Sequence, residues 1–322
     1  MLTYLVTGAA GFIGSNLVRA LLARGERVRG IDNFATGKRE NLADVISRMD
    51  FRKVDLLDEP ALREACAGID CILHQAALPS VPKSVADPLT SHKANINGTL
   101  NLLLAARDAK VKRIVYAASS SAYGDTPTLP KREDMPTNPI SPYAVQKLTG
   151  ELYMNSFHRV YGMETVSLRY FNIFGPWQAA DSPYSGVLAK FITFMLQGRQ
   201  PTILGDGEQS RDFTYIDNAV AANLLAASAP GEKVAGQVFN VATGSRYSLN
   251  QTFEILKKLT GYSGKPAYGE PRSGDVKHSL GDVTCAREAF GYAPQVNFEE
   301  GLRRTVEWYR TQTPQLTADL AR

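Results

Sequence analysis

The sequence predicts an α/β protein: a Rossmann-type, doubly wound parallel sheet followed by a smaller C-terminal α/β lobe. Short β-rich runs alternate with amphipathic helical stretches through about residue 170, which is typical of a parallel sheet covered by helices. The first β-rich run leads directly into three glycines spaced three apart and then into a helical pattern. After about residue 172, connectors rich in proline and glycine separate shorter elements. We therefore expect a first domain over residues 1–172 and a second over 173–322, with some elements of the second returning to the first.

The strands and helices of the first domain can be placed in order along the chain. We expect strands at 2–7, 27–31, 51–54, 70–73, 112–117 and 164–169, and helices near 12–24, 59–66, 91–109 and 142–161. Ligands of such sheets bind at the carboxyl ends of the strands. The residues that fall at these ends are Gly8–Gly14, Asp32, Asp55, Ala76, Ala77 and Ser119–Ser121.

The glycine-rich junction is predicted to bind a dinucleotide. Gly8, Gly11 and Gly14 let the backbone turn tightly and approach a ligand, and the N–H groups and dipole of the following helix favour a pyrophosphate. Asp32 follows Gly14 by 18 residues and could accept hydrogen bonds from the adenosine ribose. Glycines are also used where a strand and a helix pack tightly against each other. The spacing of the three glycines alone is therefore modest evidence for dinucleotide binding, and their position at the start of the chain strengthens it.

Composition excludes several other classes of function. Hydrophobic residues make up 44% and charged residues 21% of the 322 residues, as in ordinary globular enzymes. The net charge of +4 comes from 36 basic and 32 acidic residues that are well mixed, so nothing favours nucleic acid or a membrane surface. The three cysteines and four histidines show no metal-ligand spacing, and we expect reduced thiols and no metal. No apolar run approaches the roughly 20 residues that span a bilayer, and no leader pattern precedes the first strand, so we expect a cytoplasmic protein.

Tyr143 and Lys147 are the candidate catalytic pair. A spacing of four places both side chains on one face of a helix, and a nearby ammonium would lower the pKa of the tyrosine from its usual value of about 10. Ser119–Ser121 follow a predicted strand directly, where one hydroxyl could hydrogen-bond to a substrate hydroxyl as its proton leaves. The alternatives are an exposed Tyr/Lys pair on a surface helix and serines that only turn the backbone.

A set of ordered motifs extends these observations over almost the whole chain. They are Thr7-Gly-x-x-Gly-x-x-Gly14, Asp32, Asp55, His74-Gln-Ala-Ala77, Asn95-Ile-Asn-Gly98, Ser119–Gly124, Tyr143-x-x-x-Lys147, Arg169-Tyr-Phe-Asn172, Gly205–Asp217 and Arg272-Ser-Gly-Asp275. Together they resemble the extended short-chain dehydrogenase/reductases, and within these the NAD-dependent nucleotide-sugar epimerases and dehydratases. The resemblance is closest to the UDP-N-acetylglucosamine and UDP-glucose 4-epimerases.

The resemblance implies a role for each matching residue. Tyr143 matches the general base, Lys147 the residue that lowers its pKa, Ser119 the assisting hydroxyl and Asn95 a residue that orders Lys147. The residues implied to bind NAD are Gly8, Gly11, Phe12, Ile13, Gly14, Asp32, Asn33, Asp55, Leu56, Ala76, Ala77, Asn95, Tyr143, Lys147 and Tyr170. The residues implied to bind a UDP-sugar are Ser120, Ser121, Asn172, Val187, Thr202, Leu204, Arg211, Arg272, Asp275 and Ser279.

Asp32 bears on which dinucleotide binds, and two arginines bear on the ligand of the second half of the chain. The Asp32 carboxylate would repel a 2′-phosphate and favours NAD over NADP, although Lys38 and Arg39 lie near it in sequence. Arg211 and Arg272 suit a diphosphate because each guanidinium offers a planar fork of donors. The resemblance thus makes residues 1–172 the NAD-binding domain and 173–322 the UDP-sugar-binding lobe.

The family contains epimerases, 4,6-dehydratases and decarboxylases, which all begin by oxidising C4 of the sugar. In the dehydratases of the family a Thr-Asp-Glu arrangement occupies the position of Ser119–Ser121, and decarboxylases tend to carry a Glu there. The resemblance therefore implies a 4-epimerase. A small residue at Ser279 is associated with N-acetylated sugars, so we expect UDP-GlcNAc/UDP-GalNAc and also UDP-Glc/UDP-Gal as substrates.

Alternatives remain open at this point. Pro176-Trp-Gln178 resembles the UDP-glucuronate 4-epimerases, and a UDP-glucuronate decarboxylase, a nucleotide-sugar 4,6-dehydratase or a nucleotide-sensing regulator would share much of the chain. The helices near 91–109 and 142–161 match helices that pair across a two-fold axis in this family. We therefore expect a homodimer built through a four-helix bundle.

Overall fold

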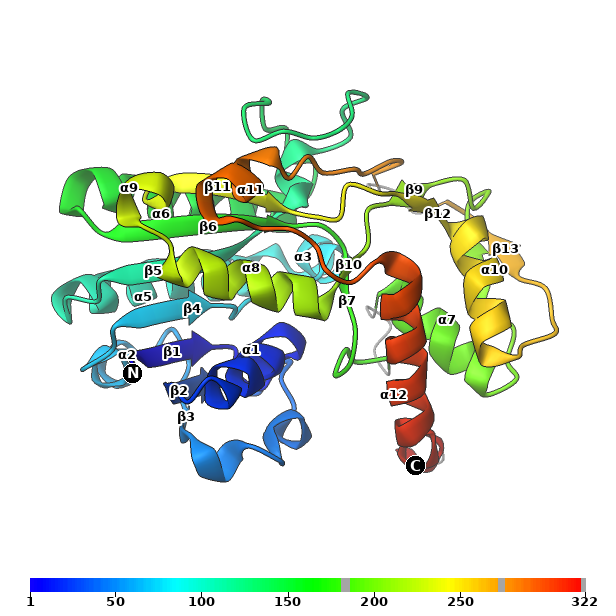
Figure 1. Ribbon diagram of the computed structural model, residues 1–322, viewed down its shortest axis with the longest axis horizontal. Helices are drawn as coiled ribbons and strands as arrows, with labels where there is room; N and C mark the ends of the chain where they lie inside the picture. The colour runs from blue at the N-terminus through cyan, green and yellow to red at the C-terminus, as the bar shows by residue number, and fades with distance from the viewer. Residues whose placement is uncertain (181–185, 272–275, 320–322) are drawn as a thin grey trace.

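The computed structural model describes residues 1–180, 186–271 and 276–319. Its core is a seven-stranded parallel sheet in the order β11-β6-β5-β4-β1-β2-β3 (Figure 1). The strands are β1 (Thr3–Thr7), β2 (Arg27–Asp32), β3 (Asp50–Lys53), β4 (Cys71–His74), β5 (Arg113–Ser119), β6 (Glu164–Tyr170) and β11 (Gln237–Val241). The chain reverses its direction across the sheet between β1 and β4, which makes their carboxyl ends the expected ligand crevice. The predicted α/β fold class is confirmed.

Helices cover both faces of this sheet because its strands alternate apolar residues between the two faces. Val6 and Val115 pack on one side with Leu17 of α1 (Phe12–Ala23), where α8 (Ile216–Ser228) also lies. Leu5 and Ile114 belong to a second buried cluster on the other side. The helices of that side are α2 (Glu59–Cys66), α5 (Gly98–Asp108) and α6 (Pro142–Tyr161).

The boundaries of α6 follow from local sequence. Ser141 caps its N-terminus by accepting a hydrogen bond from the Ala144 N–H at 3.2 Å, and Pro142 occupies the first turn, where a missing N–H costs nothing. The helix ends at Gly162, which has a φ of +69°. The helix has the bounds that the sequence predicted.

The helix predicted near 91–109 is interrupted in the structure. α3 (Val81–Ala86) and α4 (Pro88–His92) precede a π-helical turn, η3 (Lys93–Asn97), and α5 starts only after it. The side chain of Asn95 accepts a hydrogen bond from the Leu78 N–H at 2.7 Å, and its carbonyl accepts the Thr99 hydroxyl at 2.7 Å. These hydrogen bonds are not part of the regular helical pattern, and they accompany the wider π-helical turn. Apolar periodicity does not reveal such a turn.

The second half of the chain forms a lobe of short strand pairs and helices. β7 (Ile173–Phe174) pairs with β10 (Thr214–Tyr215), β8 (Thr202–Leu204) with β13 (Ala267–Gly269), and β9 (Ser210–Arg211) with β12 (Tyr247–Ser248). The helices of the lobe are α7 (Val187–Leu196), α10 (Leu249–Thr260) and α12 (Phe298–Asp319). The elements that return to the first sheet are β11 and α8, with α9 (Gly231–Val234) and α11 (Thr284–Phe290) beside them.

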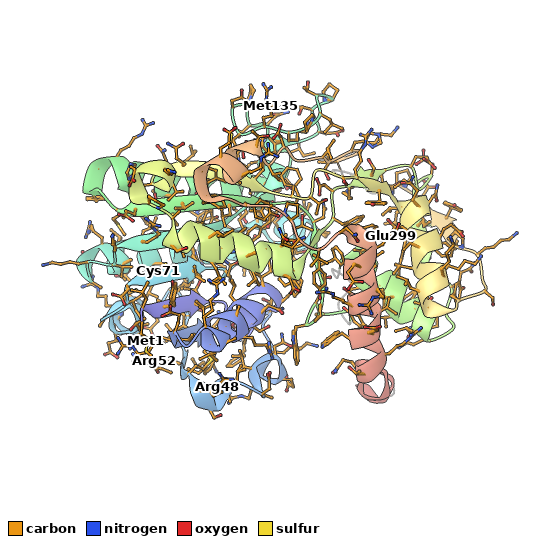
Figure 2. The ribbon with its side chains drawn as sticks, viewed as in Figure 1. Met1, Arg48, Arg52, Cys71, Met135 and Glu299 are labelled. Carbon is orange, nitrogen blue, oxygen red and sulfur yellow. The ribbon has the colours of Figure 1, made fainter. Side chains whose placement is uncertain are left out.

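Short 3-10 turns and connections complete the molecule. The turns are η1 (Arg39–Leu42), η2 (Ile46–Arg48) and η4 (Ser120–Tyr123). Met135 lies in the long connection between η4 and α6, which stands above the sheet in Figure 2, whereas Cys71 lies within β4. Cys66 and Cys71 are buried free thiols, and burial raises the pKa of each to about 12. Within the described part of the chain, no helix combines the length and the apolar character needed to cross a membrane.

Candidate active site

A cavity of about 1870 Å³ lies at the carboxyl ends of the strands and extends into the lobe. Most predicted site residues line it: Gly8, Gly11, Phe12, Ile13, Gly14, Asp32, Asn33, Asp55, Leu56, Ala76, Ala77, Ser119, Ser120, Ser121, Tyr143, Lys147, Tyr170, Asn172, Arg211 and Ser279. Asn95, Val187, Thr202 and Leu204 do not line it. Arg272 and Asp275 lie outside the described residues.

The glycine junction forms a close backbone cradle at one end of this cavity. A Cβ on Gly8 would lie 2.9 Å from Ala76 Cα, and a Cβ on Gly14 would lie 2.0 Å from the Gly8 oxygen. Gly11 caps α1 and offers no side chain to its first N–H groups. These N–H groups and the helix dipole fit the pyrophosphate of a dinucleotide.

Asp32 lies beside this cradle and is buried. Its carboxylate accepts hydrogen bonds from the N–H groups of Ala10 at 3.0 Å and Phe34 at 2.7 Å. Burial raises the pKa of Asp32, and the two backbone bonds act in the opposite direction. Nearby, Asn33 donates a 2.8 Å hydrogen bond to Asp55. The acceptors and amides around this end fit the adenosine half of NAD.

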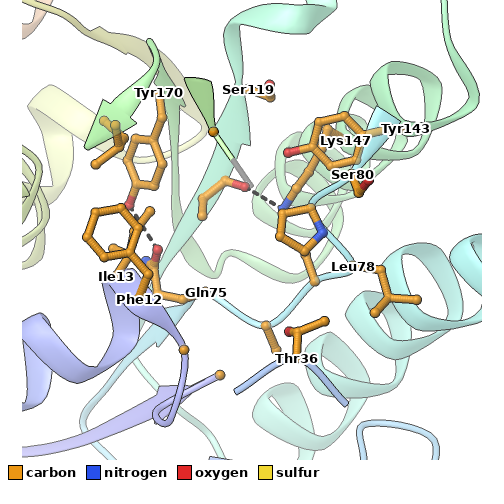
Figure 3. Close-up of a pocket in the computed structure, with 18 of the residues that line it drawn as sticks. Phe12, Ile13, Thr36, Gln75, Leu78, Ser80, Ser119, Tyr143, Lys147 and Tyr170 are labelled. Atoms are coloured by element: carbon orange, nitrogen blue, oxygen red, sulfur yellow. Dashed lines mark hydrogen bonds between the residues drawn. The ribbon is translucent and has the colours of Figure 1, made fainter. Parts of the chain in front are cut away.

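The catalytic candidates converge where β5 and α6 meet the cavity (Figure 3). Lys147 is buried, donates a 2.8 Å hydrogen bond to the Ala117 carbonyl, and lies 4.9 Å from the centre of the Tyr116 ring. Tyr143 lies one helical turn earlier on the same face of α6. Ser119 ends β5, and its hydroxyl accepts a 2.8 Å hydrogen bond from the Ser121 hydroxyl.

The two ionisable groups of this pair are both shifted toward their neutral forms. Burial raises the pKa of Tyr143 to about 12, an effect that the Ser119 hydroxyl partly opposes. Burial lowers the pKa of Lys147 to about 7. The sequence led us to expect a lowered pKa for Tyr143. In the chain by itself the cost of burying a charge is larger than the effect of the neighbouring lysine.

Tyr170 holds a fixed position opposite this pair. Its hydroxyl donates to Gln75 Oε1 at 3.2 Å and accepts from Asn223 Nδ2 at 2.7 Å (Figure 3 shows the first bond). Gln75 Nε2 in turn donates to Asn223 Oδ1 at 3.1 Å, which closes a ring of three hydrogen bonds. Figure 3 places Phe12 and Ile13 beside the Tyr170 ring. These hydrogen bonds fix Tyr170 between the glycine cradle and the lobe formed by the second half of the chain.

His74 is a positioning residue that the sequence argument did not assign. The Thr7 hydroxyl accepts hydrogen bonds from the N–H groups of Gln75 and Ala76, so it donates its own hydrogen to His74 Nδ1 at 2.7 Å. His74 Nε2 then carries the hydrogen that Thr99 Oγ1 accepts at 3.0 Å. Burial lowers the pKa of His74 to about 3, so the ring stays neutral and fixes the loop that follows β4.

The lobe end of the cavity is polar and cationic. Asn172 has a φ of +39° and donates to the Asp212 carbonyl at 2.9 Å and to Ser279 Oγ at 3.2 Å. Arg211 Nη1 donates to the backbone carbonyls of Ser210 and Lys277, both at 3.0 Å. The cavity lining also includes His278, whose pKa is lowered by burial and then by the charges of Arg246, Lys277 and Arg211. This concentration of positive charge suits an anionic ligand.

Other lining residues were missed because they carry no motif of their own. They are Thr36, Leu78, Ser80, Lys83, Lys131, His278, Trp308 and Tyr309, whereas the lining residues Trp177 and Gln178 belong to the Pro176-Trp-Gln178 motif. The tertiary fold brings them to the cavity from separate segments. Leu78, Ser80 and Lys83 follow the His74 motif, and His278 precedes Ser279. The structure describes no group of three or more His, Cys, Asp or Glu side chains that could hold a metal ion.

Residues 4–242 match the sequence profile of the NAD dependent epimerase/dehydratase family. Over 314 residues the chain is 40% identical to a UDP-glucose 4-epimerase of Mycolicibacterium smegmatis, covering 96% of this chain and 99% of that protein. It is 36% identical over 317 residues to a UDP-glucuronate 4-epimerase of Thermodesulfobacterium geofontis, with 95% of each covered. A solved UDP-N-acetylglucosamine 4-epimerase of Methanobrevibacter ruminantium, in complex with UDP-N-acetylmuramic acid, superposes with a TM-score of 0.92 at 41% identity. That match covers 97% of this chain and 99% of the other.

Proposed function

The chain belongs to the NAD-dependent epimerase/dehydratase family, and we propose that it is a UDP-hexose 4-epimerase. Its substrates are UDP-GlcNAc and UDP-GalNAc, with UDP-Glc and UDP-Gal also accepted. The residues that line the cavity carry the roles that the family resemblance implies. The glycine cradle, Asp32 and Tyr170 hold NAD, and Asn172 and Arg211 hold the UDP diphosphate.

The observation that carries this proposal is the position of acidic groups around the cavity. Among the lining residues that the structure describes, the acidic ones are Asp32, Glu40 and Asp55, which follow or lie near β2 and β3. The run Ser119–Ser121 beside Tyr143 contains no aspartate or glutamate. Expulsion of water from the sugar needs an acid and a base in addition to the oxidising groups. Epimerisation needs only the tyrosine, the hydroxyl and the cofactor.

The described residues suit each part of the reaction. The Tyr143 phenolate takes the proton of the sugar 4-hydroxyl group, and the Ser119 hydroxyl hydrogen-bonds to the same oxygen as it becomes a carbonyl. NAD held by the glycine cradle, Asp32 and Tyr170 would supply the hydride chemistry at C4. Tyr143 gives its proton back as the hydroxyl re-forms on the inverted carbon, so the reaction is redox-neutral. A firm hold on the diphosphate and a loose hold on the sugar let the ketone present its other face between the two steps.

Ser279 supports acceptance of an N-acetylated sugar. Its side chain is small, lines the cavity and shares a hydrogen bond with Asn172, and we infer that the wall here leaves room for an acetamido group. Replacement by tyrosine fills that room. We expect Ser279→Tyr to lower kcat/KM for UDP-GlcNAc by about a hundredfold, as steric exclusion of a substrate group does, and to change turnover of UDP-Glc much less. Ser279→Ala, which stays small, is the matched control.

A turnover panel of UDP-Glc, UDP-GlcNAc and UDP-GlcA, run without added cofactor and followed by mass spectrometry, tests the proposal. Epimerisation conserves mass, so products that have lost water or carbon dioxide would overturn it in favour of a lyase. The second candidate is a UDP-glucuronate 4-epimerase, because Trp177 and Gln178 of the motif shared with those enzymes line the cavity. Turnover of UDP-GlcA alone would select it.

Two further properties belong to the same proposal. We expect a homodimer, since exposed apolar residues lie on α3, α4 and α6. We also expect a cytoplasmic location, where free thiols such as those of Cys66 and Cys71 stay reduced. Fractionation of the source cells, with immunodetection of the chain in the cytoplasmic fraction, checks the location.

A further inference from the structure

The two tryptophans of the chain touch each other at the edge of the cavity. The ring centres of Trp177 and Trp308 are 5.3 Å apart, and both residues line the cavity. The guanidinium carbon of Arg19 lies 4.1 Å from the centre of the Trp177 ring. The three side chains come from α1, from the segment after β7 and from α12. We call this arrangement the Arg19–Trp177–Trp308 stack.

Arg19 is held by several partners besides the ring. Its guanidinium donates to both carboxylate oxygens of Asp44, at 3.0 and 2.5 Å, and to the carbonyls of Ser15 at 3.1 Å and Asn41 at 2.7 Å. Only about a fifth of its side chain is exposed. These partners fix the orientation of the planar cation independently of Trp177. A cation held in this way favours a strong cation–π contact.

The backbone around Trp177 is held from both sides. Asn16 of α1 donates a 3.2 Å hydrogen bond to the Pro176 carbonyl, and the Tyr309 hydroxyl of α12 donates to the Gln178 carbonyl. Trp177 itself has a φ of +71°, which is unfavourable for any residue with a Cβ. A strained residue persists only where its surroundings determine it fully, and such residues cluster at ligand clamps.

The stack connects the two halves of the site. Asn16 and Arg19 lie one and two turns beyond Phe12 and Ile13, which form the pyrophosphate end of the glycine cradle. The segment that carries Trp177 begins directly after Asn172, at the substrate end, and passes between α1 and α12 in Figure 1. An opening of the stack would therefore separate the wall that holds the dinucleotide from the wall that holds the lobe.

We propose that the Arg19–Trp177–Trp308 stack is a clasp that retains the dinucleotide in the cavity between turnovers. This inference rests on the proposed function, because a redox-neutral epimerase must keep its cofactor until the hydride has been returned. Loss of the reduced cofactor in mid-reaction would leave a ketone sugar that the enzyme cannot convert. Arg19, Trp177 and Trp308 act as positioning residues: they hold the walls and take no part in proton transfer.

The test uses Trp177→Gly and Arg19→Gln in the full-length holoprotein. Glycine accepts the positive φ, so the first variant removes the ring without adding strain. NAD loaded onto each protein is followed through repeated desalting. We expect the variants to release it at least about tenfold faster than wild type, in line with loss of one cation–π contact. Arg24→Gln, an exposed arginine at the end of α1, is the control and should release NAD at the wild-type rate.

Two further measurements separate this inference from the proposed function. Without added NAD the variants should lose turnover over successive desalting steps, and added NAD should restore kcat to within about twofold of wild type, as expected for loss of ground-state binding alone. Trp308→Phe leaves Trp177 as the one remaining tryptophan of the chain, and NAD binding should change its fluorescence. Wild-type release rates in both variants, or turnover that NAD cannot restore, would overturn the clasp. Fast release in a protein that converts no UDP-sugar would refute the proposed function and leave the clasp standing.

Discussion

In the chain by itself Tyr143 is uncharged near neutral pH, since burial raises its pKa to about 12, and Lys147 has lost much of its charge there, since burial lowers its pKa to about 7. A base of this kind has to be activated by a positive charge that arrives with the ligand. An oxidised nicotinamide brings one, and its field favours both the phenolate of Tyr143 and the release of a proton from the sugar hydroxyl. We therefore expect Tyr143 to take a proton only in the enzyme that holds the oxidised cofactor.

We predict that Tyr143→Phe removes turnover while leaving ligand binding nearly intact. Phenylalanine keeps the aromatic ring of this α6 residue and removes only the acidic hydroxyl. General base catalysis contributes about 10²–10⁴-fold, so kcat should fall by at least about a hundredfold. Steady-state kinetics and NAD retention give the two readouts. Unchanged kcat would show that another group takes the proton.

A second residue-scale prediction concerns the pH dependence of stability in the cofactor-free protein. The lowered pKa of Lys147 means that between about pH 7 and 10.5 the unfolded chain binds a proton that the folded chain does not. The free energy of unfolding therefore rises with pH in this window, by up to about 1.4 kcal/mol per pH unit. Lys147→Met lacks this contribution, so wild type should gain about 1–3 kcal/mol relative to the variant between about pH 7 and 9.

Denaturant unfolding of both proteins at several pH values measures this difference. The other strongly shifted groups are common to both chains, so their effects cancel in the comparison. His74, with a pKa lowered to about 3, changes its contribution below this window, and Tyr143, with a pKa raised to about 12, above it. Parallel pH profiles for wild type and Lys147→Met would show that Lys147 keeps its charge when buried.

At the scale of elements, α6 is fixed to the sheet by a buried ion pair one turn beyond Lys147. Glu151 accepts hydrogen bonds from Arg169 Nε at 2.9 Å and Nη2 at 2.6 Å, and both side chains are less than a tenth exposed. Arg169 belongs to β6, the strand that ends in Tyr170. Tyr143, Lys147 and Glu151 thus share one helix face, and the third of them anchors the first two.

Removal of one partner of this pair should be strongly destabilising. Glu151→Leu leaves the Arg169 guanidinium buried without a counter-charge, which costs about 3–5 kcal/mol of unfolding free energy. The double variant Glu151→Leu with Arg169→Met removes both charges and should recover most of the loss. Glu307→Gln breaks the exposed Glu307–Arg303 pair and, as the control, should change stability by less than about 1 kcal/mol. Equal stabilities of the single and double variants would contradict the prediction.

The sequence allowed the main elements to be placed but left others out for physical reasons. The strands of the first domain lie within two residues of their predicted bounds because each is a short apolar run closed by a polar or glycine signal. The interruption at Asn95 depends on a hydrogen bond to Leu78, which lies 17 residues away and leaves no trace in periodicity. Two-residue strands such as β7 and β10 are too short to show any period.

The candidate site divides in the same way. The glycine cradle and the Tyr143–Lys147 pair could be predicted because each is a local motif whose spacing alone brings its members together. The Arg19–Trp177–Trp308 stack could not be predicted, since its residues are far apart in the chain and meet only through the packing of α1 and α12. No role was predicted for His278, although it directly precedes Ser279. Its place in a cationic surface depends on Arg211 and Arg246, which only the tertiary structure brings near it.

At the scale of the whole molecule, the site exists because the chain crosses between its two halves several times. β11 and α8 return from the lobe to the first sheet, and β6 passes directly into the strand pair of β7 and β10. The cavity walls therefore come from both halves, and the relative position of the halves sets the width of the cavity.

The helices α3, α4 and α6, the last of which carries Tyr143 and Lys147, expose apolar side chains. Val85 of α3, Leu89 of α4 and Leu152 of α6 are 63%, 73% and 62% exposed, and these helices pack against one another. Apolar residues exposed on adjoining helices mark a protein interface, and a two-fold axis would bring each such residue against the same surface of a second copy. We therefore expect wild type to be a dimer by light scattering coupled to size exclusion.

Leu152→Lys places a charge in this apolar surface in both copies and should shift the mass to that of a monomer, because desolvating two unpaired ammonium groups opposes association. Leu152 lies on the outer side of α6, away from the buried face of Lys147 and Glu151, so NAD retention should persist in the monomer. Tyr268→Lys alters a residue of the lobe that is 57% exposed and, as the control, should leave the mass unchanged. A wild-type chain that stays monomeric at every concentration would contradict the predicted dimer. A Leu152→Lys variant that is still a dimer would show that the interface lies on another face.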